Sequence, residues 1–415
     1  SHYAVVPLPD FTMSSPLAGL TVLDFSHALA GPYCTMLMAR YGATVIKVED
    51  TNTGDMGRTW GPPFLGGEAS YFLGLNGGKR GIAIDLKNAE GRALCKRLIE
   101  RADIVIENFR PGTMDRLGLG YPVARELNPR LIYCSISGYG QTGPRRDDPA
   151  MDLILQAASG LISVTGTTDG ETVRCGHSVA DITAGMFALI GVMFALRARE
   201  STGAGQYVDV SMLDGMISAM ASNYANFFGS GTTPRPWGTG FGTIVPYACY
   251  PTADREIALA VASEKLWRAF CQALDRPEWI DHERYRTNAL RIAHRAELEP
   301  LIAEVLTTRT ASEWIETFRT TGVPATLVNT LDDVANDPQS SEREMFPVVD
   351  HPTAGPNRVT GAPLKLSDTE CTPLDPAPFH GQHTAGVLRD LLGLSPDDLE
   401  RLTRQGTIRQ HSVRS

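Results

Sequence analysis

The stretch LTVLDFSHALAGPYCTMLMARYGATVIKVE, residues 20–49, decides the fold. It opens with a short apolar run (20–26), continues with a helix-like segment that closes on a glycine (31–43), and ends with a second run rich in β-branched residues (44–49). Strand, helix and strand in direct succession are typical of a βαβ unit, in which the two strands are parallel. The stretch therefore predicts the first unit of a parallel sheet.

The same alternation continues along the chain. Further strand-like runs follow at 81–86, 103–109 and 131–137, and a helical pattern at 89–102 separates the first two. Because short apolar strands that alternate with helices form sheets covered on both faces, we expect an α/β fold with a doubly wound, parallel-sheet large domain. Residues 14–228 are expected to form the first part of this Rossmann-like domain.

The composition changes after the large domain. Residues 229–247 (GSGTTPRPWGTGFGTIVPY) are rich in Gly, Pro and Thr, which predicts a loop and a domain boundary. Strand and helix patterns follow, including a capping box from Thr310 to Glu313, so residues 229–344 are expected to hold a linker and a smaller α/β domain. The many prolines beyond them predict that 345–415 form an extended tail that returns to the large domain.

Composition and charge exclude several function classes. The chain of 415 residues carries a net charge of −9, which argues against a nucleic-acid partner because such proteins present a basic face. Its seven cysteines include no CxxC pair, so neither a disulfide framework nor a zinc ribbon is indicated, and we expect a cytoplasmic protein.

No membrane partner is expected either. The longest apolar run, Met186–Leu196, is shorter than the roughly 20 residues that span a bilayer, so it is interpreted as a buried helix. Residues 1–16 lack a basic region followed by an apolar stretch and do not indicate a secretory signal.

Familiar cofactor and catalytic motifs are missing. The turn at 26–32 has one glycine where a dinucleotide-binding unit has three, and the GxGxxG at 138–143 is followed by charged residues instead of an apolar helix. The histidines show no metal-ligand spacing, and we expect no metal site. There is also no GxSxG elbow and no Walker A loop.

One carboxylate remains of interest. Asp181 stands at the start of the most apolar helical segment, where an aspartate is usually an N-cap. A carboxylate beside small residues at a helix N-terminus is also open to approach, and it can attack a thioester as a covalent nucleophile. The local pattern leaves both interpretations open.

Several segments resemble, in order, the signature blocks of the class III CoA-transferases, the CaiB/BaiF family. They are LAGLTVLDFSHALAGPYCTMLMARYGATVIKVE, GDMGRTWGPPF, NGGKRGIAIDLKNAEG, DIVIENFRPGTMDRLGLGY, YCSISGYGQTGP and STGAGQYVDVSMLDG. RTWGPPF, YCSISGYGQTGP and WGTGFGTIVPY are most similar to the branch that includes succinyl-CoA:glutarate CoA-transferase.

The resemblance implies an enzyme that moves CoA between carboxylic acids, with Asp181 as nucleophile, an acyl-CoA thioester as substrate and no permanently bound cofactor. The CoA-binding residues that it implies are His27, Ala28, Leu29, Ile84, Asn108, Phe109, Arg116 and Leu117. Tentative substrate or glycine-loop residues are Arg58, Ser137, Gly238, Gly240 and Gly242. Arg58, Arg116 and Lys79 are candidates to pair with CoA phosphates or a distal carboxylate, or are solvated surface charges.

The resemblance also bears on specificity and assembly. Leu29 and Ser137 stand where the formyl-CoA branch has glutamine and lysine, so formyl transfer to oxalate is not expected. Succinyl-CoA is the expected donor and a short dicarboxylic acid the expected acceptor. Two ring-like subunits are expected to interlock as a homodimer.

Two alternatives stay open. The α-methylacyl-CoA racemases share this fold, but they need a histidine opposite the aspartate, and Met151 stands at that position. His177 is nearby in sequence and is expected to be structural or to contact substrate. A binding protein that has kept the fold without the activity is the second alternative.

Overall fold

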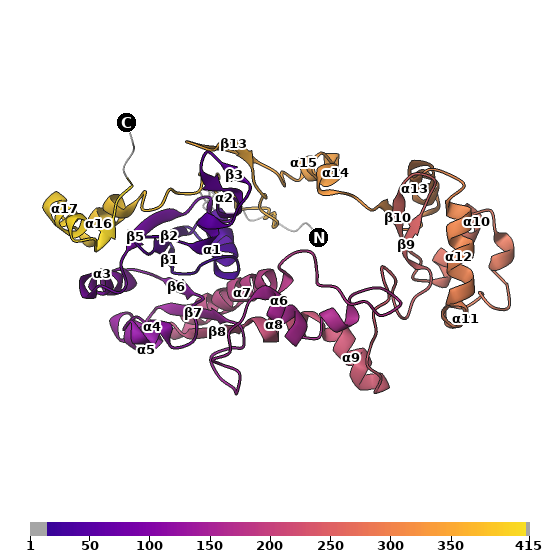
Figure 1. The fold of residues 1–415 in the computed structure, drawn as a ribbon, viewed down its shortest axis with the longest axis horizontal. Helices are drawn as coiled ribbons and strands as arrows, with labels where there is room; N and C mark the ends of the chain where they lie inside the picture. Colours follow the sequence, from indigo (N-terminus) through magenta and orange to yellow (C-terminus); the bar gives the residue numbers. More distant parts are fainter. Residues whose placement is uncertain (1–14, 412–415) are drawn as a thin grey trace, which may run out of the picture. The chain divides into compact units, whose positions relative to one another are not determined.

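The computed structural model describes residues 15–411, which form two units (Figure 1). The first unit holds the chain up to Leu161, Cys175–Ser230 and everything from Ser341 onward. The second holds Ile162–Arg174 and Gly231–Ser340. The chain therefore leaves the first unit and later returns to it. Most of the segment in which no secretory signal is expected lies outside the described residues.

The first unit is built on a seven-stranded sheet with the order β14-β5-β2-β1-β6-β7-β8. Its strands are β1 (Thr21–Asp24), β2 (Thr44–Glu49), β5 (Arg80–Ile84), β6 (Ile104–Glu107), β7 (Ile132–Ser137), β8 (Tyr207–Ser211) and β14 (Ile408–Arg409). All neighbours are parallel except β14, which pairs with β5 in the antiparallel sense. The predicted parallel-sheet core is confirmed.

Helices cover both faces of this sheet because its buried strands send alternate apolar side chains to each side. Val105 of β6 lies in one core, whereas its neighbours Ile104 and Ile106 lie in the other. The first core is covered by α3 (Ala89–Ile99), α5 (Tyr121–Leu127), α16 (Thr384–Leu392) and α17 (Pro396–Arg404). The second is covered by α1 (Ala30–Arg40), α6 (Asp152–Ala158), α7 (Val179–Thr202) and α8 (Met212–Ala219) (Figure 1).

The strand order reverses beside β1. From β1 the chain crosses through α1 to β2 on one side, whereas β6 pairs with β1 on the other side. In open α/β sheets, ligands bind at the carboxyl ends of strands where the order reverses in this way. Residues 26–29 after β1 and residues 108–109 after β6 lie at this point.

Helix α7 corrects one prediction. Its buried stripe consists of small residues, Ala180, Ala184 and Ala188. Its opposite stripe is apolar but exposed, with Met186 and Ile190 each 43% exposed and Phe194 72% exposed. The segment is therefore a half-exposed helix, not a buried one. Within residues 15–411 it is also the one helix long and apolar enough to cross a membrane, a test that core helices of soluble proteins pass as well.

The second unit contains a three-stranded antiparallel sheet of β9 (Tyr247–Pro251), β10 (Glu256–Ala260) and β11 (Ala325–Leu327). Helices α10 (Glu264–Ala273), α12 (Arg295–Leu306) and α13 (Ala311–Thr321) supply the rest of its aromatic-rich core. The predicted capping box is confirmed, because Thr310 and Glu313 bond each other's backbone at the start of α13.

The predicted extended tail is wrong for its last part. It begins with a hairpin of β12 (Val348–His351) and β13 (Gly355–Arg358), but α16, α17 and β14 follow. A capping box between Ser395 and Asp398 starts α17, and proline is tolerated in the first turn that follows. The prolines before residue 379 thus do not prevent helices further on.

Candidate active site

Asp181 is not the N-cap of its helix. Helix α7 begins at Val179, and Ser178 in the N-cap position makes no side-chain hydrogen bond. Instead, Oδ1 of Asp152 on α6 accepts hydrogen bonds from the backbone N–H groups of Ala180 and Asp181, at 2.9 and 3.4 Å. Asp152 therefore caps the helix from a distant part of the sequence, and the capping interpretation of Asp181 is wrong.

The carboxylate of Asp181 is left free for chemistry. Among the described residues, no donor makes a hydrogen bond to its oxygens, although the side chain is largely buried. Burial, and to a smaller degree the charge of Asp152, raise the pKa of Asp181 to about 7. A carboxylate that is poorly stabilised as an anion is a stronger nucleophile or base than a solvated one.

A close helix contact fixes the direction in which Asp181 faces. A side chain at Gly185 would lie 2.6 Å from the carbonyl oxygen of Ala30 and 3.1 Å from Cδ1 of Tyr33, so α7 touches the start of α1 at this glycine. Residues four apart lie on the same face of a helix. Asp181 is therefore on the face of α7 that meets the beginning of α1, the helix that follows residues 26–29.

The ends of β1 and β6 are joined through His27 and Asn108. The backbone N–H of His27 donates to Oδ1 of Asn108 at 2.8 Å, and Nδ2 of Asn108 donates to the carbonyl oxygen of His27 at 2.8 Å. The rings of His27 and Phe109 lie 5.3 Å apart. The structure thus brings together three of the predicted CoA-binding residues at the point where the strand order reverses.

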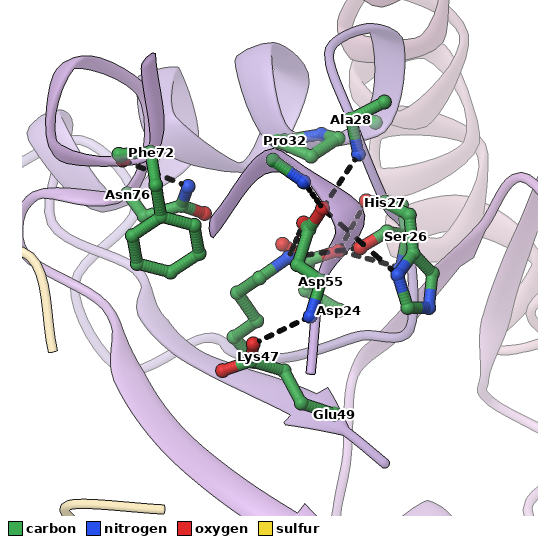
Figure 2. A network of polar contacts seen from close by, with 12 residues as sticks. Asp24, Ser26, His27, Ala28, Pro32, Lys47, Glu49, Asp55, Phe72 and Asn76 are labelled. Atoms are coloured by element: carbon green, nitrogen blue, oxygen red, sulfur yellow. Dashed lines mark hydrogen bonds and ion pairs between the residues drawn. The ribbon is translucent and has the colours of Figure 1, made fainter. Parts of the chain in front are cut away.

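Ala28 has an unusual backbone. Its φ of +64° is in the left-handed region, which costs a residue with a Cβ roughly 1–2 kcal/mol. Its N–H donates to Oδ1 of Asp55 at 3.0 Å, and the same oxygen accepts from Gly57 at 2.8 Å (Figure 2). Lys47 completes the arrangement, with Nζ 2.7 Å from Oδ2 of Asp55 and 2.8 Å from the carbonyl oxygen of Ser26.

Two predicted substrate-binding cations are already engaged within the protein. Arg58 donates to both carboxylate oxygens of Glu49, at 2.7 and 2.8 Å, and its guanidinium lies over the ring of Phe72. Lys79 is 2% exposed and pairs with Asp24 at 3.1 Å. Lys79 is therefore not a solvated surface charge, whereas a contact of Arg58 with a substrate carboxylate or a phosphate stays a prediction.

The remaining predicted residues are spread more widely. Ile84 is 0% exposed and pairs with β14 in the sheet, so its side chain offers no surface to a ligand. Ser137 ends β7 with a buried hydroxyl that has no hydrogen-bond partner in the described part of the chain. Leu117 follows α4 (Thr113–Arg116) and packs partly against the first core.

Arg116 is accompanied by a second arginine. A side chain at Gly112 would lie 3.2 Å from Nη1 of Arg116 and 3.7 Å from Nη2 of Arg146, so the two guanidinium groups meet beside this glycine. The Nε atom of Arg146 is buried and lacks a partner among the described residues. Neighbouring guanidinium groups of this kind suit a phosphate, whereas no metal-binding group of His, Cys, Asp or Glu occurs within residues 15–411.

The predicted glycine loop lies in the second unit, whereas Asp181 lies in the first. Gly238 has a φ of +62° and donates to the carbonyl oxygen of Gly166 at 2.9 Å. A side chain at Gly242 would meet Nε1 of Trp237 at 2.9 Å. The contact of this loop with the substrate, including any by Gly240, stays a prediction.

Tyr71 is a further candidate for the site, and the sequence did not reveal it. It lies on α2 (Ser70–Asn76), and its ring meets that of Trp60 edge-on at 5.0 Å. Burial, followed by the charges of Asp181, Asp55 and Asp152, raises the pKa of Tyr71. Its hydroxyl is therefore within electrostatic reach of all three carboxylates. No motif marks such a tyrosine, and no role was assigned to Asp152 from the sequence either.

Comparison with known proteins identifies the family to which the chain belongs. A model of the family described as CoA-transferase family III matches residues 17–384, and the chain belongs to this family. Human succinyl-CoA:glutarate CoA-transferase is 35% identical over 98% of this chain and 93% of its own length. A succinate–glutarate CoA-transferase of Agrobacterium fabrum is 38% identical over 91% and 96%.

The chain is also similar to a relative named for another substrate and to a protein of known crystal structure. A succinyl-CoA:mesaconate CoA-transferase of Haloarcula marismortui is 38% identical over 90% of this chain and 95% of its own. The crystal structure of a CaiB/BaiF family protein from Brucella suis aligns with a TM-score of 0.82 and 35% identity, covering 91% of this chain and 100% of that one. The predicted family is confirmed, and the chain is an enzyme of the class III CoA-transferase type.

Proposed function

We propose that this protein transfers CoA from succinyl-CoA to a short dicarboxylic acid, with Asp181 as the nucleophile. The observation that carries this proposal is the free carboxylate of Asp181, which lies on the face of α7 that meets the start of α1 and has a pKa near neutrality. Because Asp152 caps the helix, the carboxylate of Asp181 does not accept hydrogen bonds from the backbone N–H groups at the helix start.

The proposed reaction has two matched halves. The Asp181 carboxylate attacks the thioester carbon of the donor, and the C–S bond breaks to give a mixed anhydride and CoA thiolate. The thiolate attacks the aspartyl carbonyl, which releases the donor carboxylate and leaves an aspartyl-CoA thioester. The acceptor carboxylate attacks this thioester, and the released thiolate then attacks the acceptor carbonyl of the new anhydride. New acyl-CoA leaves and the Asp181 carboxylate is restored.

The substrate class rests on the relatives. Their names specify succinyl-CoA or succinate as one partner and glutarate or mesaconate as the other. We propose that His27, Ala28, Leu29, Asn108 and Phe109 contact the CoA chain, because these residues meet at the point where the strand order reverses. Arg116, joined by Arg146, is proposed to meet a phosphate.

The proposal also includes a cytoplasmic homodimer of interlocked subunits. The exposed apolar stripe of α7 supports self-association, since monomeric proteins seldom leave a long helix face of this kind in water. The odd number of cysteines, all free in the structure, suits a reducing compartment.

The decisive experiment is to trap the aspartyl-CoA thioester. The protein is incubated with succinyl-CoA without an acceptor, treated with borohydride or hydroxylamine, digested and examined by mass spectrometry. We expect the modification at Asp181 and nowhere else. A parallel incubation of Asp181→Asn should stay unmodified while still binding CoA. An Asp181→Ala variant that transferred CoA at the parent rate would overturn the proposal.

A further inference from the structure

A buried ion pair supports residues 26–29, and both of its partners come from other segments of the chain. Lys47 comes from β2, and Asp55 precedes the short 3-10 helix η1 (Met56–Thr59). Their side chains are 0% and 1% exposed, and Nζ and Oδ2 lie 2.7 Å apart. Burial would raise the pKa of Asp55, but the charge of Lys47, with smaller contributions from His27 and the bond to Ala28, lowers it to about 2.

The pair holds the backbone on both sides of His27. Lys47 binds the carbonyl oxygen of Ser26, and Asp55 binds the N–H of Ala28 (Figure 2). Asn108 holds His27 itself from the opposite strand. Every one of these anchors is a side chain of another segment, so the local sequence alone does not maintain this loop.

The strained conformation of Ala28 depends on one of these anchors. An alanine leaves the left-handed region unless its surroundings hold it there. The carboxylate of Asp55 does so by accepting the Ala28 N–H, and it cannot move because it also binds Gly57 and Lys47. Replacing a buried ion pair with apolar residues often leaves stability unchanged, so stability alone does not account for this costly pair.

We propose that Lys47 and Asp55 are positioning residues that fix the 26–29 loop in the shape that binds acyl-CoA. The inference rests on the proposed function, because that loop is the proposed CoA contact. Neither residue touches the reacting atoms in this proposal. Asp55 sets the backbone of Ala28, and Lys47 sets Asp55 and Ser26.

The test compares Asp55→Ala with Asp55→Asn in the full-length protein. Asparagine keeps an oxygen that accepts from Ala28 and Gly57, whereas alanine removes it. We expect Asp55→Ala to weaken CoA binding, measured by calorimetry, and to raise KM for succinyl-CoA by about tenfold or more, with a smaller change in kcat. Asp55→Asn, which keeps the acceptor, should lose less CoA affinity than Asp55→Ala, and Lys47→Met should also weaken CoA binding because it releases the carbonyl oxygen of Ser26.

A rescue variant separates positioning from general damage. Glycine adopts positive φ without strain, so Ala28→Gly added to Asp55→Ala should recover most of the lost CoA affinity. A merely structural loss at Asp55 would not be repaired by removing a methyl group from Ala28.

Asp103 offers a matched control at the other end of β1. Its carboxylate accepts the N–H of Thr21 at 3.0 Å and pairs with Arg199 at 3.2 Å, as Asp55 does with Ala28 and Lys47. Asp103→Ala should lower Tm without changing CoA affinity.

The outcomes are distinct. If the parent protein does not bind CoA, the proposed function fails. If the parent binds CoA and Asp55→Ala binds it equally well, only the positioning role fails. An Asp103→Ala variant that lost as much CoA affinity as Asp55→Ala would also overturn it. Should Asp55→Ala not fold, Lys47→Met carries the same comparison with the parent, and unchanged CoA affinity in that variant would overturn the positioning role.

Discussion

Asp152 caps the helix that carries Asp181, with its Oδ1 2.9 Å from the backbone nitrogen of Ala180 and 3.4 Å from that of Asp181 itself. One carboxylate thus orients the helix start and also acts on the pKa of the other through its charge. An aspartate at a helix start is usually the cap, and here Asp152 has that role while the carboxylate of Asp181 stays free.

The pH dependence of the reaction should show the raised pKa of Asp181 and the part that the charge of Asp152 has in it. Because Asp181 attacks as an anion, log(kcat/KM) for succinyl-CoA should rise with a slope of one up to about pH 7 and level off above it. Asp152→Asn keeps an acceptor oxygen for the helix but removes the charge, so the pKa of Asp181 should fall and the rising limb should move to lower pH. Burial is the larger cause and remains, so the limb should stay above the ordinary aspartate range. An unmoved limb in initial-rate measurements would show that Asp152 does not act through its charge.

Removing the charge of Asp181 should stabilise the fold. Its pKa is 3.8 in the reference state and about 7 in the folded protein. Between these values the unfolded chain loses its proton first, so stability falls as pH rises and the penalty is complete above pH 7. Asp181→Asn should therefore raise Tm at pH 8 by about 1–2 °C for each kcal/mol gained, and by little near pH 4. Calorimetry that found the same Tm difference at both pH values would contradict the raised pKa.

Arg146 should contribute to CoA affinity. If its guanidinium joins Arg116 at a phosphate, Arg146→Gln should raise KM for succinyl-CoA by about tenfold, the effect of roughly 1.4 kcal/mol, and leave kcat unchanged. Arg145→Gln is the matched control, because Arg145 is paired with Asp148 at 2.9 Å and stacked on Tyr139, whereas the pair of Arg146 with Asp147 is longer, at 3.8 Å.

A CoA thioester that lacks the 3′-phosphate shows whether Arg146 contacts that phosphate of CoA. If Arg146 meets that group, the variant and the parent should have similar KM values with this substrate. Equal KM values with intact succinyl-CoA would exclude any role for Arg146.

Proton exchange should be absent. Met151 precedes α6 with a side chain that is 60% exposed and cannot carry a proton, so a second acid–base group opposite Asp181 is not provided there. A 2-methylacyl-CoA incubated with the protein in D2O should acquire no deuterium at its α carbon, as judged by NMR, while CoA transfer from succinyl-CoA proceeds. Deuterium uptake that Asp181→Ala abolished would favour the racemase alternative.

Local patterns predicted the parts of the fold that depend on neighbouring residues. The run at 44–49 coincides with β2, and the capping box at Thr310 starts α13, because both depend on residues close in sequence. The ion pair between Asp24 and Lys79 joins residues far apart in sequence, so its burial could not be read from either segment. Lys79 was therefore expected near phosphates or solvent.

The candidate site shows the same limit. The nucleophile Asp181 was assigned from family resemblance, whereas its local pattern pointed to a cap. Only the folded chain brings Asp152 to the start of α7 and leaves the carboxylate of Asp181 unbound. Likewise, the run at 186–196 was interpreted as a buried helix, because its exposed stripe is as apolar as a core.

The last strand has a consequence for how the molecule is made. Residues Ile408 and Arg409 form β14, which pairs with Ile84 and Ala83 of β5. Domains generally fold as units during synthesis, in order from the N-terminus. Here the second unit can fold on the ribosome as soon as its segments emerge, but the edge of the first sheet stays open until residues 408–409 have been made. The first unit begins before the second unit and is thus completed after it, and a ribosome that stalls before residue 408 leaves the sheet of the first unit unfinished.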